Sequence, residues 1–61
     1  MTSTEVFNAI SKSNSEQCYA IVYLVNNYRI EEAVDLILER FDCSRDAAEE
    51  TAYMIKAKLR K

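Results

Sequence analysis

The sequence contains no histidine, no glycine and no proline among its 61 residues. Without histidine there is neither the general base of the usual catalytic triads nor a His-based metal site. Without glycine there is no P-loop and no dinucleotide-binding fingerprint, and the tight turns of β-hairpins lack their preferred residue. We therefore expect no enzymatic activity, no cofactor and no bound metal, and an all-β architecture is disfavoured.

Long hydrophobic runs are also missing. The longest uninterrupted apolar stretch, residues 18–25, has eight residues, whereas a membrane span needs about 20. The first five residues lack the basic start of a secretory signal. We therefore expect a cytoplasmic protein without a membrane segment, in which Cys18 and Cys43 are reduced thiols. A bridge between the two stays an alternative, because a sequence gives no distance between them.

The charges that are present are unevenly distributed. Ten acidic and eight basic residues give a net charge of −2. Residues 1–53 hold all ten acids and four bases, whereas residues 54–61 hold no acid and four bases: Lys56, Lys58, Arg60 and Lys61. Cations at the end of a helix complement its dipole. The same four residues are the candidate contacts if the chain binds nucleic acid.

The length and the turn signals predict a small helical bundle. A chain of this size forms one domain, residues 1–61, whose core stabilises it by about 3–5 kcal/mol, and such chains often add a partner subunit. Turn residues at 13–15, 26–27 and 42–44 divide the chain into four segments. We expect an all-α, compact bundle of three to four short helices at about 3–12, 15–27, 30–41 and 44–60, with a helical hairpin at 30–60.

The clearest signal is the helical periodicity of the third and fourth segments. Their apolar residues recur at the three- and four-residue spacing of an amphipathic helix that packs one face on a core. The predicted core-facing residues are Ile30, Ala33, Val34, Ile37, Leu38 and Phe41 in the third segment, Ala48, Thr51, Ala52, Ile55 and Leu59 in the fourth, and Val6, Phe7 and Ile10 in the first.

Polar residues at the segment starts predict the helix caps. We expect Ser3 or Thr4 to cap the first helix and Ser44 to cap the fourth. Ser13 and Glu16 have the spacing of a capping box at the start of the second helix.

The second segment is apolar around its whole circumference. Residues 18–25 fit either a buried strand or a helix, and we interpret them as a helix because no other segment offers a partner strand. A helix that is apolar on all sides lies at the centre of a domain or against another subunit. We therefore expect a homodimer, or contact with another protein or peptide. The candidate interface residues are Tyr19, Tyr23, Leu36, Tyr53, Met54 and Ala57.

The hairpin at 30–60 also resembles a helix–turn–helix, which makes a DNA-associated transcriptional regulator an alternative function. A recognition helix reads DNA with residues near its start. Here that position carries Asp46, Glu49 and Glu50, whose carboxylates repel phosphate. The alternative therefore depends on the basic residues at 54–61.

Residues 16–59 resemble the helical half of the PqqD-like peptide-recognition domains. The stretches that carry this resemblance are residues 20–24 (AIVYL), 29–37 (RIEEAVDLI), 41–44 (FDCS) and 50–55 (ETAYMI), followed by Leu59. The resemblance implies an accessory protein that presents leader peptides to enzymes of ribosomal peptide modification. Such domains begin with a three-stranded sheet, for which residues 1–15 are too few, and they carry a glycine where Asn26 and Asn27 stand here.

Three classes of function follow. The first is a small non-enzymatic protein-binding regulator, adaptor or inhibitor that acts through an exposed apolar and acidic helical surface. The second is the DNA-associated regulator, and the third is the PqqD-like accessory protein.

Overall fold

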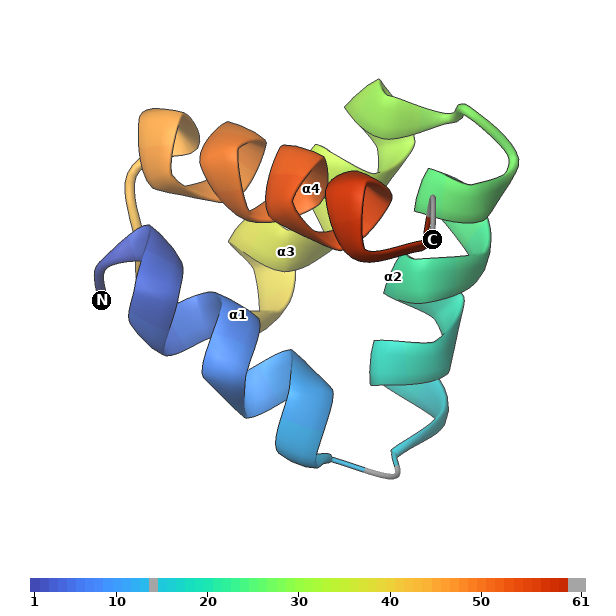
Figure 1. Cartoon of the computed structure of the whole chain (residues 1–61). Helices are drawn as coiled ribbons and strands as arrows, with labels where there is room; N and C mark the ends of the chain where they lie inside the picture. The colour runs from blue at the N-terminus through green and yellow to red at the C-terminus, as the bar shows by residue number, and fades with distance from the viewer. Residues whose placement is uncertain (14, 60–61) are drawn as a thin grey trace.

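The computed structural model describes residues 1–13 and 15–59, and in that part of the chain it consists of helices and the turns that connect them, with no strand. In chain order these are α1 (Ser3–Lys12), α2 (Glu16–Asn26), α3 (Ile30–Arg40) and α4 (Arg45–Leu59) (Figure 1). The predicted all-α class is confirmed. The first and last residues of each predicted segment lie within two residues of the ends of an observed helix. Residues 18–25 are helical and belong to α2.

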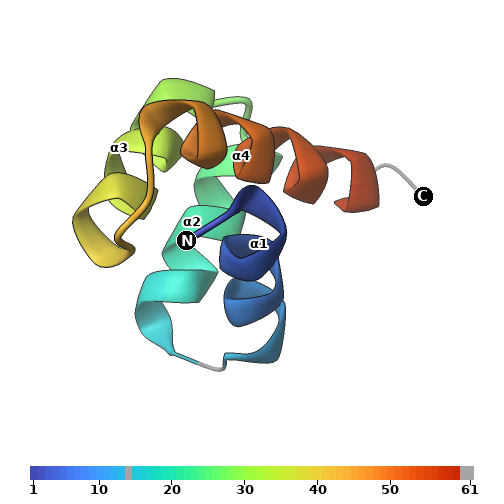
Figure 2. The ribbon, with the colours of Figure 1, turned by 90° about the vertical axis from the view of Figure 1, so that its left-hand side faces the viewer.

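The longest helix, α4, contacts each of the other three helices. It lies across α1, α2 and α3 in both views of the ribbon (Figures 1 and 2). α2 also packs on α3, and α3 packs on α4 as the predicted hairpin, whereas α1 packs mainly on α4. Arg45 of α4 bridges to α3, because its guanidinium lies 3.8 Å from the Asp35 carboxylate. Its second ion pair, with Glu49 at 3.5 Å, lies within α4.

The core is formed by residues of the predicted apolar stripes together with Cys18, Ile21 and Val25 of α2. In α3 the buried residues are Ala33, Val34 and Ile37. In α4 they are Ala48, Thr51, Ala52 and Ile55. The prediction is wrong for Leu59, which is 44% exposed. Leu59 lies in the last turn of α4, beyond the point at which α1 and α2 fill the space beneath this helix, so it borders an open groove.

Thr51 is a fully buried polar residue within this core. Its hydroxyl donates to the Ala47 carbonyl oxygen at 2.8 Å and lies 3.2 Å from the carbonyl oxygen of Ser3. The second contact ties α4 to the first turn of α1, 48 residues away in the sequence. The burial of this hydroxyl is therefore compensated by hydrogen bonds, as buried polar groups require.

α1 begins with a capping box, one residue earlier than predicted. Thr2, rather than Ser3 or Thr4, is the cap: its hydroxyl accepts from the Glu5 backbone N–H at 3.2 Å. In return the Thr2 backbone N–H donates to the Glu5 carboxylate at 2.8 Å. The hydrogen bond from the Thr2 backbone N–H, with a smaller contribution from the Thr2 side chain, holds the pKa of the Glu5 carboxyl below its ordinary value, because a donor favours the charged carboxylate.

The starts of α2 and α4 are capped by serines. The predicted capping box of Ser13 and Glu16 is wrong, because Ser15 caps α2 by accepting from the Cys18 backbone N–H at 3.3 Å. Ser13 instead accepts from the backbone N–H of Ser15. The cap predicted for α4 is present, since the Ala47 backbone N–H donates to the Ser44 hydroxyl at 3.2 Å.

The turn from α2 to α3 uses a left-handed residue that is not glycine. The Arg29 N–H donates to the Leu24 carbonyl and the Tyr28 N–H to that of Val25, at 2.9 and 3.0 Å. These are the two bonds of a Schellman motif, whose left-handed position is usually glycine. Here Tyr28 occupies it with φ 61°. The Lys56 ammonium lies 5.2 Å from the centre of its ring.

Candidate functional site

An apolar groove opens between α1 and α2, beneath the C-terminal half of α4. We call it the α1–α2 groove. The two helices diverge from the short connection between them and each packs on α4 (Figure 1), so a hollow of ≈ 270 Å³ is left between them. The described residues that line it are Phe7, Ile10, Ser11 and Ser13 from the α1 side, Cys18, Tyr19 and Val22 from α2, and Ile55, Lys58 and Leu59 from α4.

The exposure of the lining residues increases from the floor of the groove to its rim. Its floor is nearly inaccessible to water: Ile10 and Ile55 are each 4% exposed and Cys18 is 7% exposed. Phe7 and Val22 are half-buried and form the walls. The rim carries Tyr19 on α2, 61% exposed, and Leu59 on α4, 44% exposed. A partner side chain that entered the groove would therefore meet a mainly apolar floor and walls, with Ser11, Ser13 and Lys58 as the polar lining residues.

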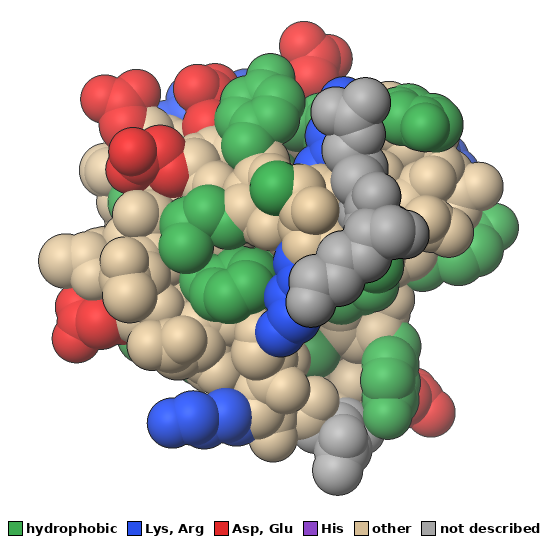
Figure 3. Space-filling view, in the orientation of Figure 1, with side chains coloured by type: hydrophobic (Ala, Val, Ile, Leu, Met, Phe, Trp, Pro, Cys, Tyr) green, Lys and Arg blue, Asp and Glu red, His purple; other side chains and the backbone are tan. Residues whose placement is uncertain are grey.

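Among the described residues that line the α1–α2 groove, Lys58 carries a charge. Its ammonium lies 5.5 Å from the centre of the Phe7 ring, a cation–π geometry that holds the Lys58 side chain against the wall of the groove. Acidic side chains gather elsewhere on this face of the molecule, toward the beginning of α4 (Figure 3). The first turns of α3 and α4 contain Glu31, Glu32 and Asp46.

The six predicted interface residues lie on three helices. Tyr19 and Tyr23 lie on α2, Leu36 on α3, and Tyr53, Met54 and Ala57 on α4. Of these six described residues, Tyr19 lines the α1–α2 groove. Tyr23 and Tyr53 are 63% and 58% exposed and Ala57 is exposed, whereas Leu36 and Met54 are half-buried. The helix α2 therefore buries one side and presents its tyrosines to water.

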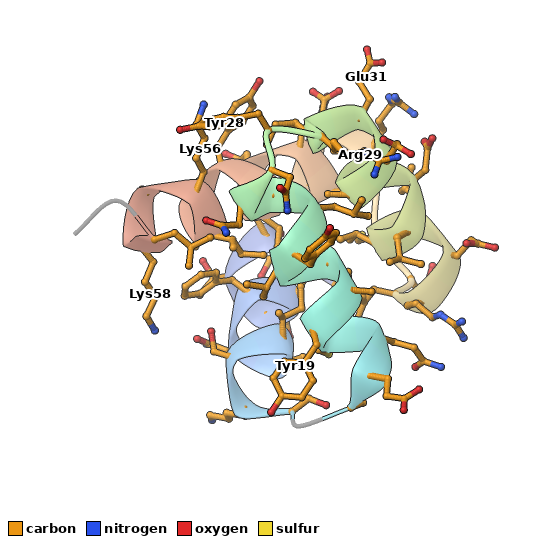
Figure 4. The ribbon with its side chains drawn as sticks, turned by 90° about the vertical axis from the view of Figure 1, so that its right-hand side faces the viewer. Tyr19, Tyr28, Arg29, Glu31, Lys56 and Lys58 are labelled. Atoms are coloured by element: carbon orange, nitrogen blue, oxygen red, sulfur yellow. The ribbon has the colours of Figure 1, made fainter. Side chains whose placement is uncertain are left out.

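The predicted nucleic-acid contacts divide into two described and two undescribed residues. Lys56 lies against Tyr28 and Lys58 extends on the side of Phe7 (Figure 4). Tyr28 is 77% exposed, so one side of its ring faces the solvent beside a cation. Arg60 and Lys61 lie outside the described residues.

Sequence reasoning did not predict the groove as a site. It assigned Phe7, Ile10, Ile55 and Leu59 to the core-facing stripes, and it treated Cys18 and Val22 as part of an apolar run. The core prediction is confirmed for Ile10 and Ile55, which form the floor of the groove. The periodicity gives each residue a direction around its helix. It does not reveal that α1 packs mainly on α4 and diverges from α2. One signal was present: Leu59 is an apolar residue among four cations, which is an unusual environment for a core position.

The remaining reactive groups are isolated from one another. Cys18 is buried, Cys43 is half-buried, and both are free thiols, so the alternative of a bridge between them is not adopted. Over residues 1–13 and 15–59, no cluster of three or more Cys, Asp or Glu side chains is placed to hold a metal ion. None of the described helices is long and apolar enough to cross a membrane.

No protein-family model matches the chain, and no curated protein and no solved structure matches it either. The resemblance to PqqD-like domains stays a prediction. Where those domains have a sheet, residues 3–12 of this chain form the helix α1.

Proposed function

We propose that the chain is a small, non-enzymatic protein-binding regulator, adaptor or inhibitor, and that the α1–α2 groove is its binding site. The observation that carries this proposal is an apolar groove that is already formed in the single chain and opens to the solvent. Its volume, ≈ 270 Å³, is below the range of about 300–1,000 Å³ that is typical of small-molecule sites. It suits one or two side chains of a protein partner.

The composition of the groove supports a protein partner. Protein interfaces place aromatic and aliphatic side chains at the centre of the contact and polar residues around it. Phe7 and Val22 line the walls and Tyr19 lies at the rim, where its ring offers area and its hydroxyl a hydrogen bond. The free thiols fit a reducing compartment, and we place the protein in the cytoplasm as part of this proposal.

Selection from a random peptide phage library tests the proposal without assuming the partner's sequence. Val22→Gln places an amide on the groove wall, and Tyr53→Ala removes an exposed aromatic side chain outside the groove. We expect selected peptides to bind the wild type and Tyr53→Ala equally and to bind Val22→Gln about tenfold more weakly, because the amide loses its water without gaining a partner. Circular dichroism verifies that both variants remain helical.

Two results would remove the groove as the site. Peptides that bind Val22→Gln as well as the wild type do not use the groove, and peptides that fail on Tyr53→Ala use the outer face of α4. In either case the exposed tyrosines Tyr19, Tyr23 and Tyr53 would replace the α1–α2 groove as the candidate binding surface. A peptide family that resembles a leader sequence would favour the PqqD-like form of the same function.

The exposed tyrosines favour self-association as a second use of the surface. Tyr19, Tyr23 and Tyr53 are each more than half exposed, and a twofold axis lets one such surface serve both subunits. Sedimentation equilibrium at micromolar concentration measures the mass directly. A species of twice 7.1 kDa is expected for a homodimer, and a species of 7.1 kDa would remove it.

Nucleic-acid binding is the second candidate function, and the pairing of Lys56 with Tyr28 favours it. An exposed ring beside a cation can stack on a base while the ammonium meets a phosphate. The acidic residues Asp46 and Glu49 are exposed near the start of α4, so this contact would use the end of the helix rather than its beginning. A gel shift at low and moderate salt tests it, since phosphate contacts weaken steeply with salt.

A further inference from the structure

The charge around the α1–α2 groove differs from that of the rest of the molecule. The chain has a net charge of −2, yet residues 54–61 hold four bases and no acid, and they include the last turns of α4 that cover the groove. The partial charge at a helix C-terminus is only about −0.5, so four cations exceed what the dipole of α4 requires. Of these four bases, Lys56 and Lys58 lie in the described part of α4, and Lys58 lines the apolar groove.

The contacts of Lys58 place one of these charges at the groove itself. Its side chain lines the groove and its ammonium lies 5.5 Å from the Phe7 ring. Among the described lining residues there is no carboxylate to neutralise it. Lys56 lies one turn away from the rim residue Leu59 and borders a second hollow with it. An occupant of the groove therefore meets an apolar floor and a positively charged edge.

We propose that the partner segment is an acidic amphipathic peptide, whose large apolar side chains enter the α1–α2 groove while its carboxylates face Lys58 and the end of α4. This inference rests on the proposed function and names the chemistry of the partner. A nucleic acid satisfies the cations but leaves the apolar walls formed by Phe7 and Val22 without a matching surface. An acidic amphipathic peptide matches both the cations and the apolar walls, because an amphipathic helix presents an apolar stripe beside a polar face.

The test uses three synthetic peptides of about 16 residues, long enough for an amphipathic helix. All carry the same leucine stripe, and their remaining positions are glutamate, glutamine or lysine. Fluorescence anisotropy with the full chain measures their affinities. At low salt we expect the glutamate peptide to bind about tenfold more tightly than the glutamine peptide, as two or three exposed ion pairs would give. The lysine peptide should bind most weakly.

Variants assign the charge effect to the groove. Lys58→Glu should weaken binding of the glutamate peptide about fivefold more than it weakens binding of the glutamine peptide, which reports the loss of the Lys58 stem from the groove wall. Lys58→Met removes the charge but keeps an apolar stem beside Phe7, and should give about half of that loss on a logarithmic scale. Arg40→Glu is the matched control, because it makes the same change of charge on α3, outside the groove. The preference for glutamate should also shrink as salt is raised.

The outcomes separate this inference from the proposed function. If glutamate and glutamine peptides bind equally, and both lose affinity with Val22→Gln, the groove binds peptides and the acidic partner is overturned. If Arg40→Glu matters as much as Lys58→Glu, the charge effect belongs to the whole molecule and the inference fails. If no peptide binds and the phage selection also yields none, both proposals fail. Binding of an oligothymidine of about 20 nucleotides in place of the peptides would assign the cations to nucleic acid.

Discussion

Tyr28 occupies a backbone conformation that favours glycine, and replacing it gives a direct test of the turn between α2 and α3. Its φ of 61° lies in the left-handed region, which costs a residue with a β-carbon about 1–2 kcal/mol. Tyr28→Gly removes this cost. Tyr28→Ala keeps it, because alanine also has a β-carbon. Both substitutions remove the tyrosine ring, so the difference between them reports on the backbone alone.

The magnitude follows from the contacts of the side chain. Tyr28 is 77% exposed, and its ring has the Lys56 ammonium 5.2 Å from its centre. Such an exposed cation–π contact contributes about 0.5–1 kcal/mol. Tyr28→Ala should therefore destabilise the protein by about 0.5–1 kcal/mol. Tyr28→Gly should be nearly neutral, since the relief of the backbone offsets the lost contact. The glycine variant is then about 1 kcal/mol more stable than the alanine variant.

Tyr53 supplies the matched control, because it is a similarly exposed tyrosine inside a helix. There the order must reverse: Tyr53→Gly should be about 1 kcal/mol less stable than Tyr53→Ala. Urea denaturation followed by circular dichroism measures all four variants, and 1 kcal/mol corresponds to about 4–8 °C in Tm for so small a protein. If Tyr28→Ala is as stable as Tyr28→Gly or more so, the Schellman motif does not end α2.

Four further predictions concern the core, the caps and the first helix. Thr51→Val should cost about 1 kcal/mol in urea denaturation for the lost hydrogen bond, and Thr51→Ala more because it also leaves a cavity; equal stability of the valine variant and the wild type would mean that the hydroxyl contributes nothing. The lowered pKa of the Glu5 carboxyl means that its stabilisation is complete above the unfolded-state pKa and is lost as pH falls through the folded-state pKa. The stability difference between the wild type and Glu5→Gln should therefore shrink in acid, and a difference that does not change with pH would contradict the capping box. Cys18→Ser should lower stability by about 1–3 kcal/mol and Cys43→Ser by less, since only the first is buried, and loss of peptide binding by a folded Cys43→Ser variant would instead indicate a thiol reaction. Amide hydrogen exchange should be faster in α1 than in α3, because α1 packs mainly on one helix; equal protection would show that α1 opens only with the whole domain.

The helices were predictable because their signals are local. The stripe from Ile30 to Phe41 fixes one face of α3 by spacing alone, and burial of Ala33 and Ile37 agrees with it. The caps of α1 and α2 were less predictable, since several serines and threonines precede each of these two helices and neighbouring residues compete for the cap position. Thr2 and Ser15 are the caps because each is the last residue with extended backbone before its helix.

The groove could not be predicted from the sequence, because it depends on which helices pack against each other. The apolar circumference of α2 predicted a helix at the centre of the domain or against another subunit; within the single chain Tyr19 and Tyr23 are exposed to water, and their contact with another subunit stays a prediction. An aromatic ring with a hydroxyl tolerates such a position better than a purely aliphatic side chain does. Phe7 and Leu59 have apolar side chains of the kind found in cores. They lie at a surface because α1 diverges from α2.

The packing of α1 on α4 also affects how the chain is assembled during translation. The bond between Ser3 and Thr51 spans 48 residues, so α1 leaves the ribosome well before α4, the helix on which it docks. At about 5–20 residues per second, the intervening chain takes a few seconds to synthesise. Meanwhile α2 and α3 can pair through their short connection, whereas Val6 and Ile10 have no partner surface. The nascent chain therefore exposes an unpaired apolar helix until α4 emerges, a period in which a chaperone or a neighbouring nascent chain can bind it.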